Sequence, residues 1–348
     1  MEQKNASFNL LVSRRFLSEE RNGISRDAEA IIFGLRNANH ISLLELEPVI
    51  NVSQKVSVPR IVRIITTIVL RKPSYYESNK SFSFIPQLQN LLPKKESTAF
   101  IRIHDIFPVT NPGWYRYLSA LSFKITLGHA IRGGHKFVCN SNYTKNELTK
   151  KYPSVNAEVL YCYPNRSPSE SCNQCEFCTA PESFDYRFLI AVGTIEPRKN
   201  YSGLINAWKI SCSSTGEKLI VVGRYGWKAK RVYKKLHSVK NIIHIEEACN
   251  YAVNQLLLKS RAFISCSFEE GFDFPSIDAA LLHKSVLLSD IPVHRELHGE
   301  GAIYFNPRND IQIKNAIDSD CNGYSNLSLE FISSTKHFQE NLMKIFDA

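Results

Sequence analysis

The chain of 348 residues has no uninterrupted apolar run of about 18 residues, the length that a helix needs to cross a bilayer. Its first residues, MEQKNASFNLL, lack the charged-then-apolar plan and the small-residue cleavage site of a secretory signal peptide. There is also no short internal repeat and no single basic tail. These absences argue against a membrane-spanning or secreted protein, and the expected location is the cytoplasm.

Cysteine is present in an odd number, nine, in a chain without an export signal. Three of the nine, Cys139, Cys162 and Cys266, lie in apolar, strand-like runs, where cysteine behaves as a small buried hydrophobe. The segment CNQCEFC instead places Cys172, Cys175 and Cys178 at repeated two-residue gaps, a spacing that metal sites use, but no fourth ligand is evident nearby. A structural metal and free thiols in an exposed linker both stay open, and neither enters the functional prediction.

The protein is basic: its formal net charge is +10, and Lys and Arg recur along the whole chain. Such a balance suits an anionic partner: nucleotide phosphates, an acidic lipid surface or a nucleic acid. For any single basic cluster, a solvated surface explains the charge equally well. The apolar fraction of 43% and the charged fraction of 22% are those of a globular protein.

Short apolar, β-branched runs alternate with helical patterns from one end of the chain to the other. Near-continuous apolar strands separated by helices indicate an α/β protein with parallel sheets covered on both faces. In the first half, the predicted strands cover residues 8–13, 41–46, 62–70, 98–105, 136–141 and 157–163. In the second half, they cover residues 187–193, 218–223, 242–245, 261–267, 285–290 and 302–305.

Residues 164–185 separate the two sets of strands. They are rich in Pro, Ser and Asn and show neither the apolar period of a helix nor that of a strand, which is typical of an inter-domain linker. The last residues form a helical pattern with Phe331, Phe338, Leu342 and Ile345 on one side. The predicted parts are an N-terminal doubly wound domain (1–165), a linker (166–185), a C-terminal doubly wound domain (186–329) and a C-terminal helix (330–348).

Ligands of doubly wound sheets bind beyond the carboxyl ends of the strands. The first notable strand exit is VGTIEPRKN, where Gly193 lets the backbone turn and Arg198 and Lys199 come just before a helix. Two cations beside a helix N-terminus make an anion site, because its free N–H groups and dipole also favour negative charge. The alternative is a basic turn that is merely solvated. The helix that follows has an apolar stripe of Tyr201, Leu204, Ile205 and Trp208.

The second exit is FEEGFDFPSIDAA, with Glu270 after a strand and Asp278 a turn inside the next helix. Pro275 suits the first turn of that helix, and the amides around Phe274 to Ile277 would form an anion nest. Carboxylates accept hydrogen bonds from sugar and ribose hydroxyls. The spacing therefore predicts a nucleotide-sugar site, with diphosphate between the two acids. The alternative makes Glu270 a capping acid and Asp278 an exposed helical residue.

Two weaker exits lie in the first half. His104 and Asp105 close an apolar strand, and the histidine would face a donor across a cleft, although a lone His is usually structural. In RNGIS, Gly23 would let the backbone approach a ligand, and Ser25 would cap the helix RDAEAIIFGL.

Together these motifs resemble the family-four glycosyltransferases of the GT-B fold. VGTIEPRKN is similar to the family's diphosphate loop, VVGRYGW to its next strand exit, and EEGFDFPSIDAALLHKSVLLSDIPVHRE to the block that opens with Glu-Gly-Phe-Gly; AIYFNP matches the closing strand. The first half fits more loosely, through NGISR, IHDIFP and KFVCNSNYTKNEL. The resemblance implies two Rossmann-like domains facing a cleft, with donor bound by the second and acceptor mostly by the first. It also implies a C-terminal helix that packs back on the first domain.

The resemblance also implies roles for particular residues. Lys199, with Arg198 beside it, would neutralise the diphosphate leaving group. Glu270 would bind donor-sugar hydroxyls, Asp278 the ribose, and His104 would lie near the C6 end of the sugar. Such enzymes are metal-independent and retain the anomeric configuration. The backbone of four further residues would hold sugar and phosphate: Asp273, Phe274, Ser276 and Ile277.

Two residues depart from the family pattern. Asp278 stands where the family has Glu, so the ribose contact there is direct, water-mediated or lost. Asp273 stands where the family usually has Gly; Asp is among the better substitutes at positive φ, but its charge would alter donor choice or impair catalysis.

The predicted function is transfer of a hexose from a nucleotide-diphosphate sugar, GDP-mannose-like by preference, to a glycan or lipid-linked oligosaccharide in O-antigen or capsule biosynthesis. The alternatives are another donor such as UDP-glucose, or a catalytically impaired partner subunit.

The aromatic stretch PGWYRYLSALSF suits a lipid-linked acceptor at the inner membrane face, or else is an ordinary buried helix.

Two other functions fit the sequence less well. A glycosidase would use Glu270 and Asp278 as acid and nucleophile, but it would not need the two cations at a helix start. A nucleic-acid binder would interleave basic and aromatic residues on one face, whereas here the charge is dispersed.

Overall fold

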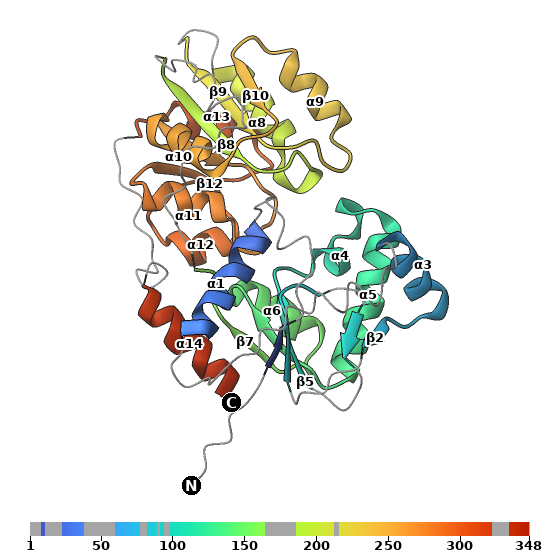
Figure 1. The fold of residues 1–348 in the computed structure, drawn as a ribbon. Helices are drawn as coiled ribbons and strands as arrows, with labels where there is room; N and C mark the ends of the chain where they lie inside the picture. Colours follow the sequence, from blue (N-terminus) through green and yellow to red (C-terminus); the bar gives the residue numbers. More distant parts are fainter. Residues whose placement is uncertain are drawn as a thin grey trace. The chain divides into compact units, whose positions relative to one another are not determined.

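The computed structural model describes residues 8–10, 23–37, 60–76, 82–88, 91–93, 98–163, 186–211, 216–321 and 334–347. The chain divides into two compact units (Figure 1). The first unit joins Met1–Asn165 to Phe331–Ala348, and the second is Arg166–Glu330. The predicted linker, the three cysteines within it and the predicted strand at 41–46 lie outside the described residues.

A parallel sheet of five strands forms the centre of the first unit, in the order β1-β3-β5-β6-β7. Its middle strand β5 is buried along almost its whole length, which explains its continuous apolar sequence. Helices α5 (Tyr117–Arg132) and α6 (Asn142–Lys151) follow β5 and β6 in the chain. The strands are β1 (Phe8–Leu10), β3 (Phe82–Ile85), β5 (Thr98–Ile103), β6 (Lys136–Cys139) and β7 (Ala157–Val159).

The strand predicted over 62–70 is wrong, because this segment is the helix α3 (Arg60–Leu70). Its β-branched residues suggested a strand, but β propensity is weak and depends on context. In the structure Ile64 and Thr67, three residues apart, are buried on one side of a helix that packs on α5. Two short parallel strands that the sequence did not indicate, β2 (Ser74–Tyr76) and β4 (Leu91–Pro93), pair with each other.

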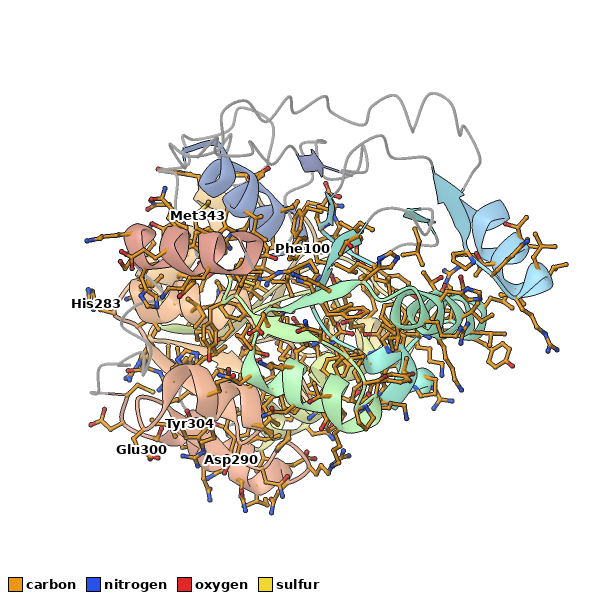
Figure 2. The ribbon with its side chains drawn as sticks, turned by 90° about the horizontal axis from the view of Figure 1, so that it is seen from below. Phe100, His283, Asp290, Glu300, Tyr304 and Met343 are labelled. Atoms are coloured by element: carbon orange, nitrogen blue, oxygen red, sulfur yellow. The ribbon has the colours of Figure 1, made fainter. Side chains whose placement is uncertain are left out.

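The C-terminal helix α14 (Thr335–Asp347) belongs to the first unit, where it lies beside α1 (Gly23–Asn37). Figure 2 shows the two helices next to each other, with Met343 on α14. The predicted apolar side of this helix is confirmed for its described residues, because all three are buried in one cluster; Phe331 lies outside them. The cluster includes Ala30, Ile31, Phe84, Phe100, Val138, Phe338, Leu342 and Ile345.

The second unit has a parallel sheet of six strands in the order β10-β9-β8-β11-β12-β13. Numbered along the unit, this is the doubly wound order 3-2-1-4-5-6, which reverses between β8 and β11. All six strands lie within segments predicted as strands. They are β8 (Phe188–Val192), β9 (Lys218–Val222), β10 (Ile242–Ile245), β11 (Ala262–Ser265), β12 (Ser285–Ser289) and β13 (Ile303–Phe305).

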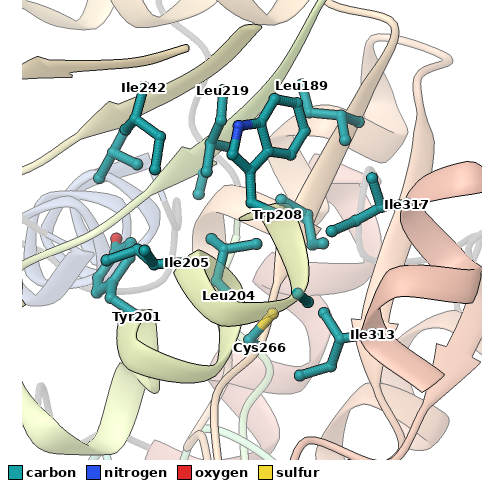
Figure 3. Packing of buried hydrophobic residues seen from close by; sticks show 14 of the residues in the cluster. Leu189, Tyr201, Leu204, Ile205, Trp208, Leu219, Ile242, Cys266, Ile313 and Ile317 are labelled. Carbon is teal, nitrogen blue, oxygen red and sulfur yellow. The ribbon is translucent and has the colours of Figure 1, made fainter. Parts of the chain in front are cut away.

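Helix α8 (Tyr201–Ser211) fills the core on one side of this sheet (Figure 3). Its predicted apolar stripe is confirmed, because all four residues are buried and Trp208 is fully so. The stripe packs between strand residues such as Leu189 and Leu219 and helix α13 (Asp310–Asp318). Each large apolar side chain buried in this way contributes about 1.5–3 kcal/mol.

The remaining helices of the second unit connect its strands. They are α9 (Lys230–His237), α10 (Asn250–Lys259), α11 (Phe274–Leu281) and α12 (Pro292–His298). None of the helices in the described ranges of either unit is both long and apolar enough to cross a membrane.

Candidate active site

The loops after β8 and β11 meet where the strand order of the second sheet reverses. This is the position at which open α/β sheets bind ligands, because the loops diverge there and leave a crevice beyond the strand ends. The two loops contain both groups of charged residues that the sequence singled out in this half of the chain.

The loop after β8 holds two cations on a short turn just before α8. Gly193 has φ of 146°, a value that favours glycine, and its carbonyl accepts a 2.7 Å hydrogen bond from Tyr201. Arg198 and Lys199 lie on the 3₁₀ turn Pro197–Lys199. Asn200 then takes the left-handed conformation, and its side chain accepts from the Gly203 amide at 3.2 Å. Hydrogen bonds therefore hold the loop in place on both sides of the two cations.

Glu270, in the loop after β11, is the centre of an ion-pair cluster. Its Oε1 lies 2.7 Å from Lys199 Nζ and accepts from Ser267 Oγ at 2.6 Å. Its Oε2 contacts the guanidinium of Arg198. Arg198 also donates to Glu196 Oε1 at 2.9 Å and to the Glu269 carbonyl at 2.9 Å. The side chains predicted to bind anion and sugar therefore meet in one place.

Asp273 is the second acid of the cluster, and it precedes α11 in the left-handed conformation, with φ of 61° and ψ of 64°. This is the backbone geometry for which Asp is a tolerable replacement of Gly. Its Oδ1 lies 3.4 Å from Lys199 Nζ, and its Oδ2 lies 3.2 Å from His294 Nε2. The other ring nitrogen of His294 is 2.8 Å from the Ser289 carbonyl, so both nitrogens of this buried ring face oxygen acceptors.

The charges of the cluster stabilise one another although the side chains are buried. Burial alone would raise the pKa of Glu270, but Arg198 and Lys199 lower it below its usual value. The pKa of Asp273 is lowered in the same way, against its burial, by Lys199 and His294. Burial would lower the pKa of Lys199, yet the two acids raise it. All three groups are therefore charged at neutral pH.

The other predicted donor residues lie on the first turns of α11. Pro275 occupies the first turn, as its missing N–H allows. Ser276 Oγ donates to the Asp273 carbonyl at 2.8 Å and lies 3.0 Å from His298 Nε2. Asp278 is buried, so the alternative of an exposed helical residue is wrong. Phe274 and Ile277, on the same turns, are also buried.

His104, in the first unit, comes just after β5 beside a buried ion pair that sequence reasoning missed. Arg102 makes two hydrogen bonds to Asp27, at 2.7 and 2.9 Å, and both side chains are fully buried. His104 Nε2 lies 3.1 Å from the Pro86 carbonyl and 3.8 Å from Asp27. Burial lowers the pKa of His104, although Asp27 opposes that shift.

Gly23 is the first residue of α1. Ser25 is therefore inside the first turn, and its predicted role as the cap is wrong. Among the described residues, no group of three His, Cys, Asp or Glu side chains could hold a metal ion. No spacing pattern pointed to His294 either, apart from its presence in the stretch SDIPVHRE.

Comparison with known proteins agrees with this geometry. A family model described as "Glycosyl transferases group 1" matches residues 180–336, which include the whole cluster in the second unit. This part of the chain is a group 1 glycosyltransferase domain. The glycosyltransferase domain is similar in sequence to bacterial mannosyltransferases. The O-antigen chain mannosyltransferase RfbU of Salmonella typhimurium is 28% identical over 219 residues, covering 62% of this chain and 59% of that protein.

A serotype-specific mannosyltransferase, WbdA of Escherichia coli, is 31% identical over 257 residues, 67% of this chain and 31% of that protein. The chain thus spans less than two thirds of the length of these curated relatives.

Solved structures show the fold. HepE from Anabaena, solved with UDP and glucose, has a TM-score of 0.56 at 14% identity, covering 98% of this chain and 94% of that one. A trehalose-phosphate synthase from Burkholderia xenovorans has a TM-score of 0.54 at 9% identity, with 83% and 76% covered. The glycosyltransferase domain is therefore part of a GT-B fold, as predicted.

Proposed function

We propose that this protein is a retaining glycosyltransferase that transfers a hexose from a nucleotide-diphosphate sugar to a glycan or lipid-linked oligosaccharide. The observation that supports it best is the cluster of Arg198, Lys199 and Glu270 at the strand reversal of the second sheet. A pathway that builds a cell-surface polysaccharide, O-antigen or capsule, is supported by the names of the related mannosyltransferases.

The proposed chemistry uses the two cations to stabilise the leaving group. When the bond between the sugar and the diphosphate breaks, negative charge grows on the departing diphosphate. Lys199, Arg198 and the N-terminal end of α11 stabilise the negative charge of the transition state more strongly than that of the ground state, which is how such a site accelerates the reaction. In the structure the positive charges of these cations are paired with the carboxylates of Glu270, Asp273 and Glu196. A diphosphate that binds the cations must therefore displace carboxylates from them.

The remaining residues have binding roles in this proposal. Glu270 turns towards the hydroxyls of the donor sugar, and Asp278 binds the ribose. The turn at Gly193 allows the backbone to approach the diphosphate, and the backbone from Asp273 to Ile277 holds phosphate and sugar. The acceptor attacks on the leaving-group face, the diphosphate takes its proton, and no covalent nucleophile is required. His104 and the loop at Gly23 would contribute from the first unit, and no metal is needed because the cations supply the positive charge.

The nucleotide-sugar donor and the cellular location are also proposed. GDP-mannose is favoured because the related proteins are mannosyltransferases, and UDP-glucose is the alternative because HepE was solved with UDP and glucose. A catalytically impaired partner subunit is the second candidate, since Asp273 adds a carboxylate at the start of α11, where the diphosphate would bind. We propose that the protein acts in the cytoplasm, peripherally on the inner membrane face, without a nucleic-acid partner.

The decisive experiment is thermal unfolding of the purified protein with a panel of nucleotide sugars, followed by measurement of donor turnover. A donor at 100 times its Kd stabilises the fold by about 2.7 kcal/mol. GDP-mannose should raise the melting temperature most, and Lys199→Met should abolish the effect. Lys209→Met, which changes an exposed lysine on α8, is the matched control. Stabilisation without turnover would indicate the impaired subunit, and no stabilisation by any nucleotide sugar would contradict both candidates.

A further inference from the structure

The acid at the start of α11 is an unexpected neighbour for a bound diphosphate. Asp273 Oδ1 lies 3.4 Å from Lys199 Nζ, the cation that binds the diphosphate in the proposed function. The side chain of Asp273 is only 1% exposed, so water screens its charge little. A diphosphate would be repelled by this carboxylate unless a further positive charge compensates it.

The two cations of the loop after β8 are too few to provide that compensation. Their ion pairs join them to three carboxylates, so the group has one negative charge in excess. A buried charge without compensation is costly, and the surroundings are therefore expected to hold a third cation. The ion-paired side chains are Arg198 and Lys199 with Glu196, Glu270 and Asp273.

His294, on the first turn of α12, contacts the second oxygen of Asp273. Its Nε2 lies 3.2 Å from Asp273 Oδ2, and its Nδ1 lies 2.8 Å from the Ser289 carbonyl. The Ser289 hydroxyl, 3.2 Å from the same Nδ1, can donate or accept, so the closer carbonyl decides the state of this nitrogen.

Neither of these two acceptors has a proton to give. A carbonyl only accepts, and Asp273 is ionised, because Lys199 and His294 hold its pKa below the usual value although burial would raise it. Both ring nitrogens of His294 must therefore donate. That requires the doubly protonated imidazolium, which carries a positive charge.

A second buried histidine, four residues further along α12, shows the contrast. Ser276 Oγ donates to the Asp273 carbonyl at 2.8 Å, so His298 Nε2, 3.0 Å from the same hydroxyl oxygen, must donate to it. His298 Nδ1 has no hydrogen-bond partner within the described ranges. Burial, together with the nearby His294, lowers the pKa of His298 to about 3. Of the two buried rings, His298 is therefore the neutral one.

We propose that His294 is the third cation of the cluster and a positioning residue for the diphosphate of the donor. It neutralises Asp273 and holds this side chain when Lys199 turns from the acid to the arriving diphosphate. The diphosphate then meets a helix start whose carboxylate is already compensated. Because this role presumes a nucleotide-diphosphate donor, it rests on the proposed function, and it explains how such a site tolerates an acid at this position.

The charge of His294 is tested first, without any ligand, by nitrogen-15 NMR of the histidine rings in the full chain. At neutral pH one ring should show the imidazolium signature, with both nitrogens protonated, and this signal should be missing in His294→Gln. The ring of His298 should show the signature of a neutral imidazole. A neutral His294 ring at neutral pH overturns the proposal.

The positioning role is tested by a double-mutant cycle in calorimetric titrations with GDP-mannose and with inorganic pyrophosphate. His294→Leu should weaken binding about tenfold, within the usual range for residues in contact. In the background of Asp273→Gly, which the φ of 61° allows, the same change should have no effect, because no acid is left to compensate. His237→Leu, at an exposed histidine of α9, is the matched control and should leave binding unchanged.

The pH dependence separates charge from packing. Of the titratable groups that face His294, Asp273 stays ionised and His298 stays neutral. Tyr304, whose hydroxyl donates to the His294 carbonyl at 3.2 Å, keeps its proton because burial raises its pKa to about 12. Binding of GDP-mannose should therefore weaken as the pH rises and His294 loses its charge, and Asp273→Gly should remove this dependence.

Each result decides between distinct explanations. A tenfold loss that persists in the Asp273→Gly background overturns the proposal, since His294 would then act through another contact. If His294→Leu fails to fold, His294→Gln, which still donates to Asp273 but has no charge, replaces it in the cycle. If neither ligand binds the unaltered chain, the proposed function fails and the positioning role fails with it, whereas NMR still decides the charge of His294.

Discussion

Replacing Lys199 by Met tests the physical basis of the charged cluster, because it keeps most of the side-chain volume and removes only the charge. Glu270 keeps Arg198 as a partner after this change, whereas Asp273 keeps only His294. Removing one member of a buried ion pair costs about 3–5 kcal/mol. For a unit of this size, about 2–4 °C of melting temperature corresponds to each kcal/mol, so the second unit should melt roughly 10 °C lower. The fluorescence of buried Trp208, with Trp114 and Trp227 replaced by Phe, reports on that unit.

The pH dependence of this loss has a definite sign. In the unaltered protein the pKa values of Glu270 and Asp273 are lowered on folding, so their stabilising contribution is present above about pH 4 and is lost as the pH falls through the folded values. Without Lys199 the pKa of Asp273 should rise, and protonation then relieves the unpaired charge. The difference in free energy of unfolding between the two proteins should therefore narrow from pH 7 to pH 4. A difference that is constant over this range would refute the reasoning and assign the loss to packing.

Three shorter predictions concern single contacts. His294→Leu should lower donor affinity and shift its pH profile, because Asp273 loses its second partner, whereas His294→Gln should restore part of the affinity in calorimetric titrations. Gly193→Ala should destabilise the fold by about 1–3 kcal/mol, because φ of 146° is strained for alanine; unchanged denaturant midpoints would contradict this. Asp27→Asn should cost about 3–5 kcal/mol by leaving Arg102 buried without its anion, while the double change Asp27→Leu with Arg102→Met should recover much of that loss in urea unfolding.

The sequence predicted the second sheet well because its signals are local. Each strand there is a run of apolar residues that ends at a turn, and the exits of parallel strands lie on one edge of the sheet. That topological rule brought Lys199 and Glu270 together in the prediction, although 71 residues separate them in the chain. Their contact in the structure follows from the position of β8 next to β11.

Prediction failed where the physical cause is not local. The run at 62–70 has strand composition, but its packing on α5 makes it a helix. The short strands β2 and β4 have three residues each, too few to show a period. The pairing of Asp27 with Arg102 joins residues 75 positions apart, and neither residue stands out in its own segment. Such buried pairs are set by tertiary packing and leave no spacing pattern.

The return of α14 to the first unit has a consequence for how the chain folds during synthesis. Ribosomes add about 5–20 residues per second, so roughly 10–30 s pass between the emergence of residue 165 and that of residue 331. During this interval the second unit can complete its core. Ile31, Phe84 and Phe100 stay partly exposed until Leu342 is synthesised and packs on them. The unit that is translated first is therefore the one that finishes last, and its uncovered apolar side chains are the natural binding sites for a chaperone on the nascent chain.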